Sequence, residues 1–399
     1  MNNRIRMLLT LAVCLAVLIA ASFISGYWKT VESNGALKVG FVYSEDESTP
    51  YTYNFVQAQH LLEEKYGNKI QVYARSNIHS KESEEPMRDL IRQGCRMLFI
   101  NMDSDIPLAL AAEFPEVQFC QVSLPTVSLE GAPKNYHTFN GEIYEARYAS
   151  GVAAGMKLRQ LMDDGVILPR DALVGYVAAN DTTEVISGFT AFLLGVRSVA
   201  PEASMRVRYT GSWSDYNAEK ETARKLIEEG CVIISQHTNT MAPAAACEKA
   251  SEDGYGVYYI GYHQSMMDIA PSTAIVSIRT NWFPYISGAV QAILDGQEIE
   301  KAVEGNAHGN DLSAGFAHDW VQLLELNTFA AASGTEEKLN RVVEEFRRGQ
   351  IDVFRGNYTG VNPHDPTDTI DLSQGYTENR DSSNPSFGYI LKDCIVVEE

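Results

Sequence analysis

Along most of the chain, short apolar runs alternate with segments in which apolar residues recur every three or four positions. Residues 226–235 show the unit. A charged segment with Leu226 and Ile227 on one face reaches Gly230, and an apolar run follows it at 231–235. Glycine just after a periodic segment marks a helix end, and a short β-branched run between polar residues is typical of a buried strand. Repetition of this unit predicts an α/β fold with helices on both faces of parallel sheets.

The pattern predicts two sets of elements in succession. The first has strands at 38–44, 71–76, 96–102, 118–122 and 136–140, the last as an edge strand, and helices at 53–66, 84–93, 106–113 and 142–161. The second has strands at 173–179, 205–209, 231–235, 257–261 and 274–279, with helices at 184–199, 217–229, 242–252 and 286–294.

The C-terminal part has a different character. An amphipathic helix is predicted at 336–348, with Ser333 and Glu336 placed as a capping box. Residues after Gly356 are rich in Asp, Asn, Ser and Thr and end in an apolar run that predicts a strand at 389–397. The aspartates of this tail do not have the spacing of a calcium-binding EF-hand loop, so a solvated loop is the better interpretation for Asp365, Asp368 and Asp371.

The two sets of elements repeat one another at a nearly constant spacing. Gly94 and Gly230 lie 136 residues apart in the same context, Leu-Ile-x-x-Gly-Cys. Gly40 and Gly175 lie 135 residues apart, each in a Val-Gly-aromatic-Val run. Chance matches would not keep one spacing, so the repeats predict two similar lobes.

The chain therefore divides into an N-terminal segment and two lobes. In residues 1–30, Arg4 and Arg6 precede an uncharged apolar run at 7–25, which predicts a signal peptide or an N-terminal membrane anchor and an exported protein. Because the second lobe has its full set of strands before residue 282, the chain then returns to the first lobe. This gives two divisions: 37–145 with 282–399 as the first lobe, and 146–281 as the second.

Composition excludes several functions. The formal net charge of −20 repels phosphate backbones and anionic surfaces, so nucleic acid is not an expected partner. The sequence has no HExxH, GxSxG, P-loop or GxGxxG motif, and its 8 histidines make no metal-ligand spacing. The 6 cysteines include no CxxC pair and fit buried positions better than disulfides or a metal site. We expect no enzymatic activity, no cofactor and no metal.

Polar and aromatic residues follow the carboxyl ends of the predicted strands, where α/β sheets bind ligands. The candidate ligand-binding residues are Tyr51, Tyr53, Asn101, Asp103, Trp213, Asp215, His237, Thr238, Tyr262, Asn281 and Trp282. Aromatic faces stack on a flat or ring-shaped ligand, while Asn, Asp and His bond to its edge or hydroxyl groups. His263 also ends a strand. For any single aromatic residue core packing is an equally good interpretation, so the prediction depends on all these loops meeting at one edge.

Several stretches resemble the basic membrane protein (BMP) family of solute-binding proteins, whose members include purine and purine-nucleoside receptors of ABC importers. They are YASGVAAG at 148–155, GFTAFLLGVRSVAP at 188–201, GSWSD at 211–215, QHT at 236–238, NWFPY at 281–285 and GQIDVFRG at 349–356. The resemblance implies a type I periplasmic binding protein, in which two Rossmann-like lobes are joined by a three-segment hinge and close on a ligand.

From the resemblance we expect a purine-like base or nucleoside as ligand, an ABC permease as partner, a monomer, and a place on the extracytoplasmic face of the membrane. It makes Trp213 and Trp282 the stacking residues, so Trp282→Ala should abolish binding and leave the fold intact. The polar contacts that it implies are Asn101, Asp103, Asp215 and His237. Two alternatives stay open: a membrane-tethered sensor of the same fold that signals to a partner protein, and a binder of another small solute such as a sugar.

Overall fold

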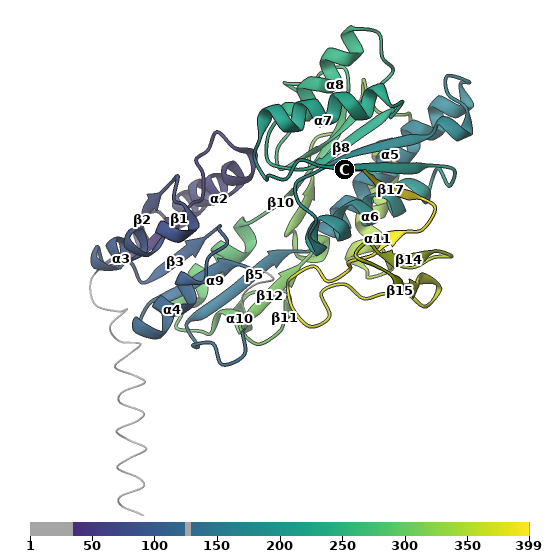
Figure 1. Ribbon diagram of the computed structural model, residues 1–399. Helices are drawn as coiled ribbons and strands as arrows, with labels where there is room; N and C mark the ends of the chain where they lie inside the picture. Colours follow the sequence, from purple (N-terminus) through teal and green to yellow (C-terminus); the bar gives the residue numbers. More distant parts are fainter. Residues whose placement is uncertain (1–34, 124–128, 399) are drawn as a thin grey trace, which may run out of the picture.

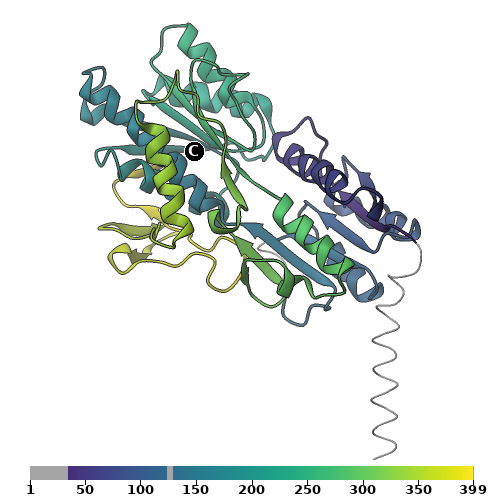
Figure 2. The same ribbon diagram turned by 180° about the vertical axis from the view of Figure 1, so that it is seen from behind.

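The computed structural model describes residues 35–123 and 129–398, which form two lobes that lie side by side (Figure 1). Each lobe has a central sheet between two layers of helices, and the view from behind shows the same arrangement (Figure 2). This is the predicted fold class. The segment expected to be a signal peptide or anchor, residues 1–30, lies outside the described residues. None of the helices within the described ranges has the length and apolar character that a bilayer crossing requires.

In the first lobe the described strands form one sheet in the order β11-β12-β5-β4-β3-β1-β2, parallel except for the β11–β12 pair. The strands are β1 Leu37–Val42, β2 Ile70–Arg75, β3 Met97–Ile100, β4 Gln118–Val122, β5 Tyr136–Gly141, β11 Asn306–Ala307 and β12 Asp311–Ala314. The helices are α2 Pro50–Tyr66, α3 Glu84–Arg92, α4 Ile106–Glu113, α9 Phe283–Leu294 and α10 Ile299–Ala302. Because side chains alternate along a strand, Val39 and Phe41 pack with α2 and α9, and Val42 packs with α3 and α4.

The second lobe repeats this plan around a sheet in the order β13-β10-β9-β8-β6-β7-β17, parallel except for the β13–β10 pair. Its strands are β6 Leu173–Ala178, β7 Ser204–Tyr209, β8 Ile233–His237, β9 Tyr258–Tyr262, β10 Ala274–Thr280, β13 Val321–Leu323 and β17 Ile395–Glu398. Its helices are α5 Ile143–Asp163, α6 Thr183–Arg197, α7 Tyr216–Glu228, α8 Ala242–Glu252 and α11 Thr335–Arg347. Helices α5, α6 and α11 cover one face with a large apolar core, and α7 and α8 cover the other. Short 3₁₀ turns lie at Gly67–Lys69, Ser80–Glu82, Pro169–Asp171, Phe316–His318 and Leu372–Gln374.

The repeated residues of the sequence occupy equivalent places in the two lobes. A Cβ atom at Gly40 of β1 would lie 3.0 Å from the Leu90 side chain, and one at Gly175 of β6 would lie 3.0 Å from the Leu226 side chain. In each lobe the glycine therefore lets a helix that covers the strand, α3 over β1 and α7 over β6, pack closely on the sheet. Both helices end before a glycine whose φ is close to +90°, a conformation that glycine adopts without strain: Gly94 and Gly230.

Within the described residues the chain passes between the lobes in three places. β5 leads into α5, β10 leads into α9, and β12 leads through the turn Phe316–His318 into β13. The crossing segments are bonded to one another, since Asn281 N donates to Trp320 O at 2.7 Å and Glu142 N donates to Ala314 O at 2.9 Å. These three crossings form the expected hinge.

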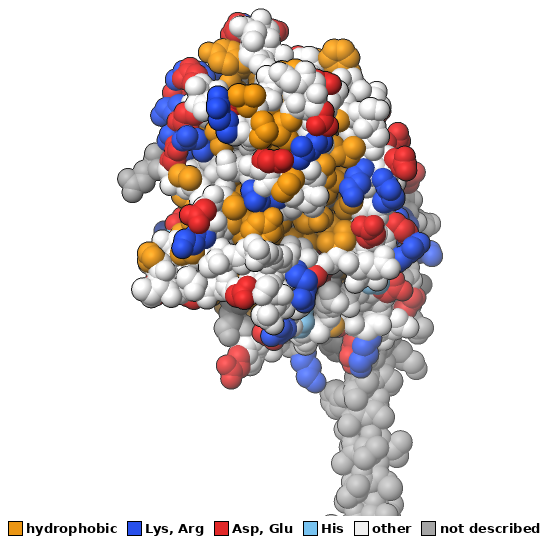
Figure 3. All heavy atoms as spheres, turned by 90° about the vertical axis from the view of Figure 1, so that its right-hand side faces the viewer, with side chains coloured by type: hydrophobic (Ala, Val, Ile, Leu, Met, Phe, Trp, Pro, Cys, Tyr) orange, Lys and Arg blue, Asp and Glu red, His pale blue; other side chains and the backbone are white. Residues whose placement is uncertain are grey.

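The C-terminal part of the chain belongs to the second lobe. β13 pairs with β10 and β17 pairs with β7. A small antiparallel sheet, the tail sheet, is made by β14 Thr359–Asn362, β15 Asp365–Asp371 and β16 Ile390–Leu391. Figure 3 views the molecule from this side and shows hydrophobic side chains gathered between charged groups. The assignment of 282–399 to the first lobe is therefore wrong from Val321 onward, because apolar residues such as Leu339 and Phe387 complete the core over α5 and α6.

Three local predictions are wrong as well. β5 is not an edge strand, because β12 arrives from far along the chain and pairs with it. Asp365, Asp368 and Asp371 lie in β15 rather than in a solvated loop, because β14 provides a strand for pairing. The capping box of α11 does not form, since the N-cap position is Gly334 and the described geometry shows no side-chain cap there.

Candidate functional site

Residues that follow the carboxyl ends of strands in both sheets meet at the boundary between the two lobes, which we call the cleft. Tyr51, in the first turn of α2, reaches from the first lobe to His263, which follows β9 in the second lobe. Their ring centroids are 5.5 Å apart, with the planes at 66°. The two lobes are therefore in contact across the cleft, and the residues around this contact form the candidate site.

The first lobe contributes a wall of aromatic rings. Trp282, just before α9, stacks on Phe55 with centroids 4.4 Å apart, and the edge of Phe139 meets it at 5.7 Å. Only 4% of Trp282 is exposed. Tyr51 stands edge-on to Trp282 at 6.5 Å, and its hydroxyl donates to Asn101 O at 3.1 Å. One face of Trp282 is thus held by the core of its own lobe, which fixes the wall in place.

The second lobe contributes stacked rings and a buried cation. The Tyr262 ring lies 3.5 Å from the His263 ring, at an interplanar angle of 29°. The Arg147 guanidinium lies 3.8 Å from the centroid of Tyr262. His237 meets the edge of Tyr262 at 5.1 Å, and Trp213 lies 6.0 Å beyond His237. These residues come from four separate segments, and the sheet brings them together at the ends of β8 and β9.

Beneath these rings lies a floor of polar groups, made by the buried Arg147 and His237 and the half-buried Glu184. Arg147 Nη1 donates to Gln236 O at 2.7 Å, but Arg147 Nε and Nη2 have no partner among the described residues. Both ring nitrogens of the fully buried His237 also lack a hydrogen-bond partner in the described ranges. Glu184 Oε1 lies 3.8 Å from His237 Nε2, and about a third of the Glu184 side chain is exposed.

Burial sets the charge states of this floor. It lowers the pKa of His237 well below the ordinary value, and the positive charge of Arg147 lowers it further. His237 is therefore neutral, with one donating and one accepting nitrogen. Burial also raises the pKa of Glu184, against the opposing effect of Arg147. A buried polar group without a partner is costly, so the floor favours a ligand that offers atoms to these nitrogens.

Several predicted residues have structural partners instead. Asp215 caps α7 by accepting a hydrogen bond from Ala218 N at 2.9 Å. Thr238 Oγ1 donates to the buried carboxylate of Glu219 at 2.8 Å. Asn281 Nδ2 donates to Asp319 O at 2.9 Å, which holds two hinge segments together. These contacts give Asp215, Thr238 and Asn281 sufficient reason to be present without a ligand.

Three further predicted residues lie in the first lobe. Asn101 is buried at the end of β3, where its Oδ1 accepts a hydrogen bond from Ser44 N at 2.8 Å. Asp103 is exposed two residues beyond Asn101. Tyr53 is partly buried and lies within electrostatic range of Arg279 of β10. Its neighbour in the second lobe therefore differs from that of Tyr51, which contacts His263. Of the predicted set, Tyr51, Trp213, His237, Tyr262 and Trp282 lie around the cleft contact.

The structure adds Arg147 and Glu184 to the candidate site. Arg147 lies within helix α5 and does not directly follow a strand in the sequence, although an arginine in the otherwise apolar run at 146–155 is a signal that could have been noticed. Glu184 lies in the first turn of α6, after the turn that follows β6. His263, which the sequence places at a strand end, supplies the contact with Tyr51.

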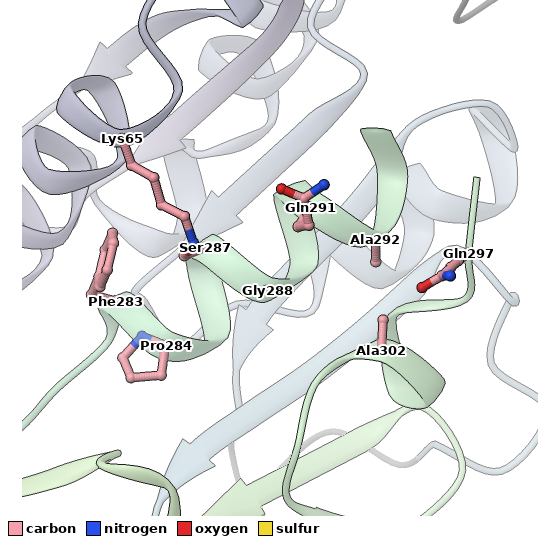
Figure 4. Close-up of a pocket in the computed structure, with 9 residues that line it drawn as sticks. All are labelled: Lys65, Phe283, Pro284, Ser287, Gly288, Gln291, Ala292, Gln297 and Ala302. Carbon is pink, nitrogen blue, oxygen red and sulfur yellow. The ribbon is translucent and has the colours of Figure 1, made fainter. Parts of the chain in front are cut away.

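A pocket of about 420 Å³ lies elsewhere on the first lobe, along α9 (Figure 4). Lys65, Phe283, Ser287 and Gln291 are among its lining residues, and Lys65 Nζ already donates to Ser287 Oγ at 2.6 Å. None of the residues around Tyr51 and His263 lines this pocket. In the described part of the chain no group of three or more His, Cys, Asp or Glu side chains could hold a metal ion.

Comparison with known proteins places this geometry in a family. Purine-binding protein BAB2_0673 of Brucella abortus (strain 2308) is 28% identical over 264 residues, which cover 65% of this chain and 69% of that protein. Putative ABC transporter glucose-binding protein TsgA13 of Haloferax volcanii is 28% identical over 224 residues, covering 56% of this chain and 51% of that protein. The solved structure of an ABC transporter solute-binding protein from Conexibacter woesei shares the fold, with a TM-score of 0.62 at 18% identity over 79% of this chain and 98% of that chain.

The family match is broader than either pairwise alignment. Residues 39–346 match the family Bmp, described as ABC transporter substrate-binding protein PnrA-like. This range contains both sheets except β17, all three crossings and every residue of the candidate site. The chain therefore belongs to the Bmp family of ABC transporter substrate-binding proteins.

Proposed function

We propose that this substrate-binding protein captures a purine base or purine nucleoside between its lobes, for delivery to an ABC permease on the extracytoplasmic face of the membrane. The observation that carries the proposal is the pairing of an aromatic wall with a buried polar floor. Tyr51 and Trp282 provide the wall from one lobe. Arg147 and His237 of the floor come from the other lobe, where both lie against the Tyr262 ring. A flat heteroaromatic ligand suits both surfaces at once.

The aromatic wall supports a planar ligand. Stacking of a base on an aromatic side chain contributes roughly 1–3 kcal/mol in nucleic-acid-binding proteins, whichever base is stacked. Trp213 is more than a third exposed on the rim of the second lobe and can stack on such a ligand from that side. Phe55 and Phe139 hold Trp282 in the core of the first lobe, and its indole Nε1 has no hydrogen-bond partner among the described residues, so this N–H group is what it can offer to a ligand.

The polar floor supports a ligand with hydrogen-bond acceptors along one edge. Arg147 has only donors, and neutral His237 has one donor and one acceptor. Ring nitrogens and a carbonyl oxygen of a purine would satisfy the nitrogens that have no partner among the described residues. In DNA recognition, arginine pairs with guanine through O6 and N7. The floor therefore favours a purine with a 6-oxo group over one with a 6-amino group.

Closure gives the capture mechanism. A ligand that touches both lobes stabilises the arrangement in which the lobes meet, and the hinge segments allow that arrangement to exchange with an open one. The ring contact between Tyr51 and His263 marks where the lobes meet. Only in the closed state does the ligand contact both lobes at once. The free energies of the two sets of contacts then add, which is the basis of tight binding.

A sugar is the second candidate ligand. One relative at 28% identity is named as a putative glucose-binding protein, and another at the same identity is named as a purine-binding protein. Sugars bind through hydroxyl groups, and each hydroxyl group needs both donors and acceptors in the site. The candidate site consists mainly of aromatic rings and has few paired donors and acceptors, so the purine is the better-supported proposal.

Titration calorimetry of the purified full chain tests the proposal. The panel should contain hypoxanthine, guanine, adenine, inosine, adenosine, glucose and ribose. We expect micromolar or tighter binding of a purine, strongest for a 6-oxo purine, and no heat from the free sugars. Binding of glucose together with no response to any purine would overturn the ligand assignment.

The role of Trp282 in binding is better tested by a substitution that disturbs the core less than Trp282→Ala does. Trp282 is almost fully buried against Phe55 and Phe139, and truncation of such a residue typically costs about 3–5 kcal/mol of stability. Loss of binding in Trp282→Ala could therefore reflect damage to the fold. Trp282→Phe keeps an aromatic ring in the core and is the variant to compare with the native chain.

A further inference from the structure

One segment of the chain joins the lobes without belonging to the hinge. We call residues 376–389 the tail strap. It leaves the 3₁₀ turn Leu372–Gln374 and returns to β16 of the tail sheet, and in Figure 1 the yellow segment extends toward β12. It lies outside the range matched by the family, so the family's hinge does not account for it.

The strap is firmly anchored on the second lobe. The buried carboxylate of Glu378 accepts hydrogen bonds from Ser187 Oγ of α6 at 2.7 Å, from Ser386 N at 3.0 Å and from Phe387 N at 2.8 Å. Phe387 is fully buried and stacks on Phe354 with ring centroids 4.1 Å apart. Separation of this end of the strap from the second lobe would expose the Phe387 ring and remove the hydrogen-bond donors of the buried Glu378 carboxylate. The anchor is therefore stable.

The other end of the strap touches the first lobe. Ser383 N donates to Asp311 Oδ2 at 2.6 Å, and both residues are buried. Asp311 lies at the start of β12, and its second oxygen accepts from Thr138 Oγ1 of β5 at 2.7 Å. The strap tip is thus seated on the first lobe through one charge-assisted hydrogen bond.

The tip is preformed but incompletely bonded. Asn379 Nδ2 donates to Ser383 O at 2.7 Å and Asn384 N donates to Ser382 Oγ at 3.1 Å, so the turn holds its own shape. Among the described residues, Asn379 Oδ1, Ser383 Oγ and Asn384 Oδ1 are buried without a hydrogen-bond partner. Buried groups of this kind disfavour the seated tip, whereas the anchor end has its carboxylate satisfied. The tip is therefore the end that can release.

We infer that the tail strap is a latch that stabilises the closed arrangement of the lobes and so raises ligand affinity. It spans the hinge from Glu378 on the second lobe to Asp311 on the first while Tyr51 and His263 are in contact. A contact that exists in the closed state and breaks on opening shifts the population toward closure and lowers the apparent dissociation constant. The inference depends on lobe closure and not on the identity of the ligand.

Asp311→Asn tests the latch, and Thr138→Val is the matched control. An asparagine at 311 can keep an acceptor toward Thr138 but turns an N–H group toward Ser383 N, whereas Thr138→Val removes the other hydrogen bond of the same carboxylate inside the first lobe. Lobe opening is read as energy transfer between dyes on L61C of α2 and Y255C after α8, both exposed positions, in a full chain carrying C14S and C394S.

In the ligand-free chain we expect lower energy transfer for Asp311→Asn than for Thr138→Val, since more molecules are open. With hypoxanthine as probe, we expect about tenfold weaker binding for Asp311→Asn, equivalent to about 1.4 kcal/mol. Equal or higher transfer in Asp311→Asn than in the control would overturn the inference. Because the ligand-free measurement needs no purine, a failure of the latch is distinguishable from a failure of the proposed ligand.

Ser383→Pro provides a second route to the same bond. Proline has no N–H group, so the strap loses its donor while the first lobe keeps its native sequence. We expect the same decrease in transfer as for Asp311→Asn. If Asp311→Asn fails to fold, an unchanged transfer efficiency in Ser383→Pro would by itself overturn the latch.

Discussion

The two lobes are alike in the middle of their sheets and different at their strand ends. Gly40 and Gly175 make the same close approach to a covering helix, to Leu90 of α3 and to Leu226 of α7. At the strand ends of the first lobe, Asn101 accepts hydrogen bonds from Tyr51 and from Ser44 N, and only its Nδ2 lacks a partner among the described residues. At the strand ends of the second lobe, His237 and Arg147 are buried with nitrogens that have no partner in the described structure.

This difference separates scaffold from recognition. The repeated middle of each lobe accounts for stability, since apolar side chains and a strand glycine pack in the same way twice. The first lobe then offers a rigid ring surface, which stacks on many flat ligands alike. The second lobe offers a buried guanidinium and a buried imidazole with unmatched nitrogens, which discriminate by the edge of the ligand because an unmatched buried group is costly. Substitutions on the two sides should therefore have different effects on binding.

The largest effect is expected from Arg147→Met. We expect about 100-fold weaker hypoxanthine binding, roughly 3 kcal/mol, since hydrogen bonds to a buried charge are lost. Replacement of a buried charge by an apolar side chain is often neutral or stabilising, so the melting temperature should not fall. Calorimetry and thermal unfolding measure the two quantities.

Lys157→Met is the control for Arg147→Met. Lys157 is a buried cation on the same helix, 4.3 Å from the Tyr258 ring centroid, away from the cleft contact. We expect no change in affinity for this variant. Equal losses of affinity in both variants would mean that α5 transmits a general disturbance and that Arg147 makes no ligand contact.

A smaller effect is expected from Gly188→Ala on α6. The added Cβ would lie 2.7 Å from His237 Nδ1 and 2.9 Å from Cε1, so the imidazole must move. We expect about tenfold weaker binding, roughly 1.4 kcal/mol. Gly288→Ala is the matched control, since its Cβ meets the Val303 side chain at 2.9 Å on the first lobe. Unchanged affinity in Gly188→Ala, with a folded protein, would remove His237 from the site.

Trp213→Ala tests the rim of the second lobe. The ring is 37% exposed, so its loss should cost little stability and remove one stacking surface. We expect about fivefold weaker purine binding, roughly 1 kcal/mol. Tyr255→Ala, another exposed aromatic residue of the second lobe at 49% exposure, should leave the dissociation constant unchanged. Titration calorimetry of both variants with the same purine measures the two dissociation constants.

The smallest effect on binding is expected at the hinge, where Glu145 gives a pH dependence of stability instead. Burial, with Glu142 beside it, raises the pKa of Glu145 to about 8, and its Oε2 accepts from Phe316 N at 2.7 Å. Between the unfolded pKa and about 8, the folded state keeps a proton that the unfolded state has lost. Stability therefore falls as pH rises through this window.

Glu145→Gln should flatten that dependence, because glutamine does not titrate and retains an acceptor for Phe316 N. Thermal unfolding of both proteins from pH 5 to pH 9 measures the slope. Parallel curves for the native chain and the variant would show that Glu145 does not carry the proton. We expect hypoxanthine affinity at pH 7 to be the same in both.

The sequence was informative wherever the chemistry is local or repeated. Helix 106–113 and helix 242–252 have the predicted bounds, since a proline in the first turn and the alanine-rich run after it favour a helix without distant partners. Residues with distant partners could not be placed in this way. β12 pairs with β5, and β17 pairs with β7, across long stretches of chain that no local pattern connects.

The sequence by itself determined that this chain folds into two repeated α/β lobes, because side-chain periodicity and a constant spacing depend on neighbours in the chain. The tertiary structure decided that Arg147 and Glu184 join His237, that Asp215 and Thr238 serve the fold, and that the tail returns to the second lobe. Those outcomes depend on which helix face meets which strand end, and on which buried polar group finds a partner. Such choices are made between residues far apart in sequence, where packing alone brings them together.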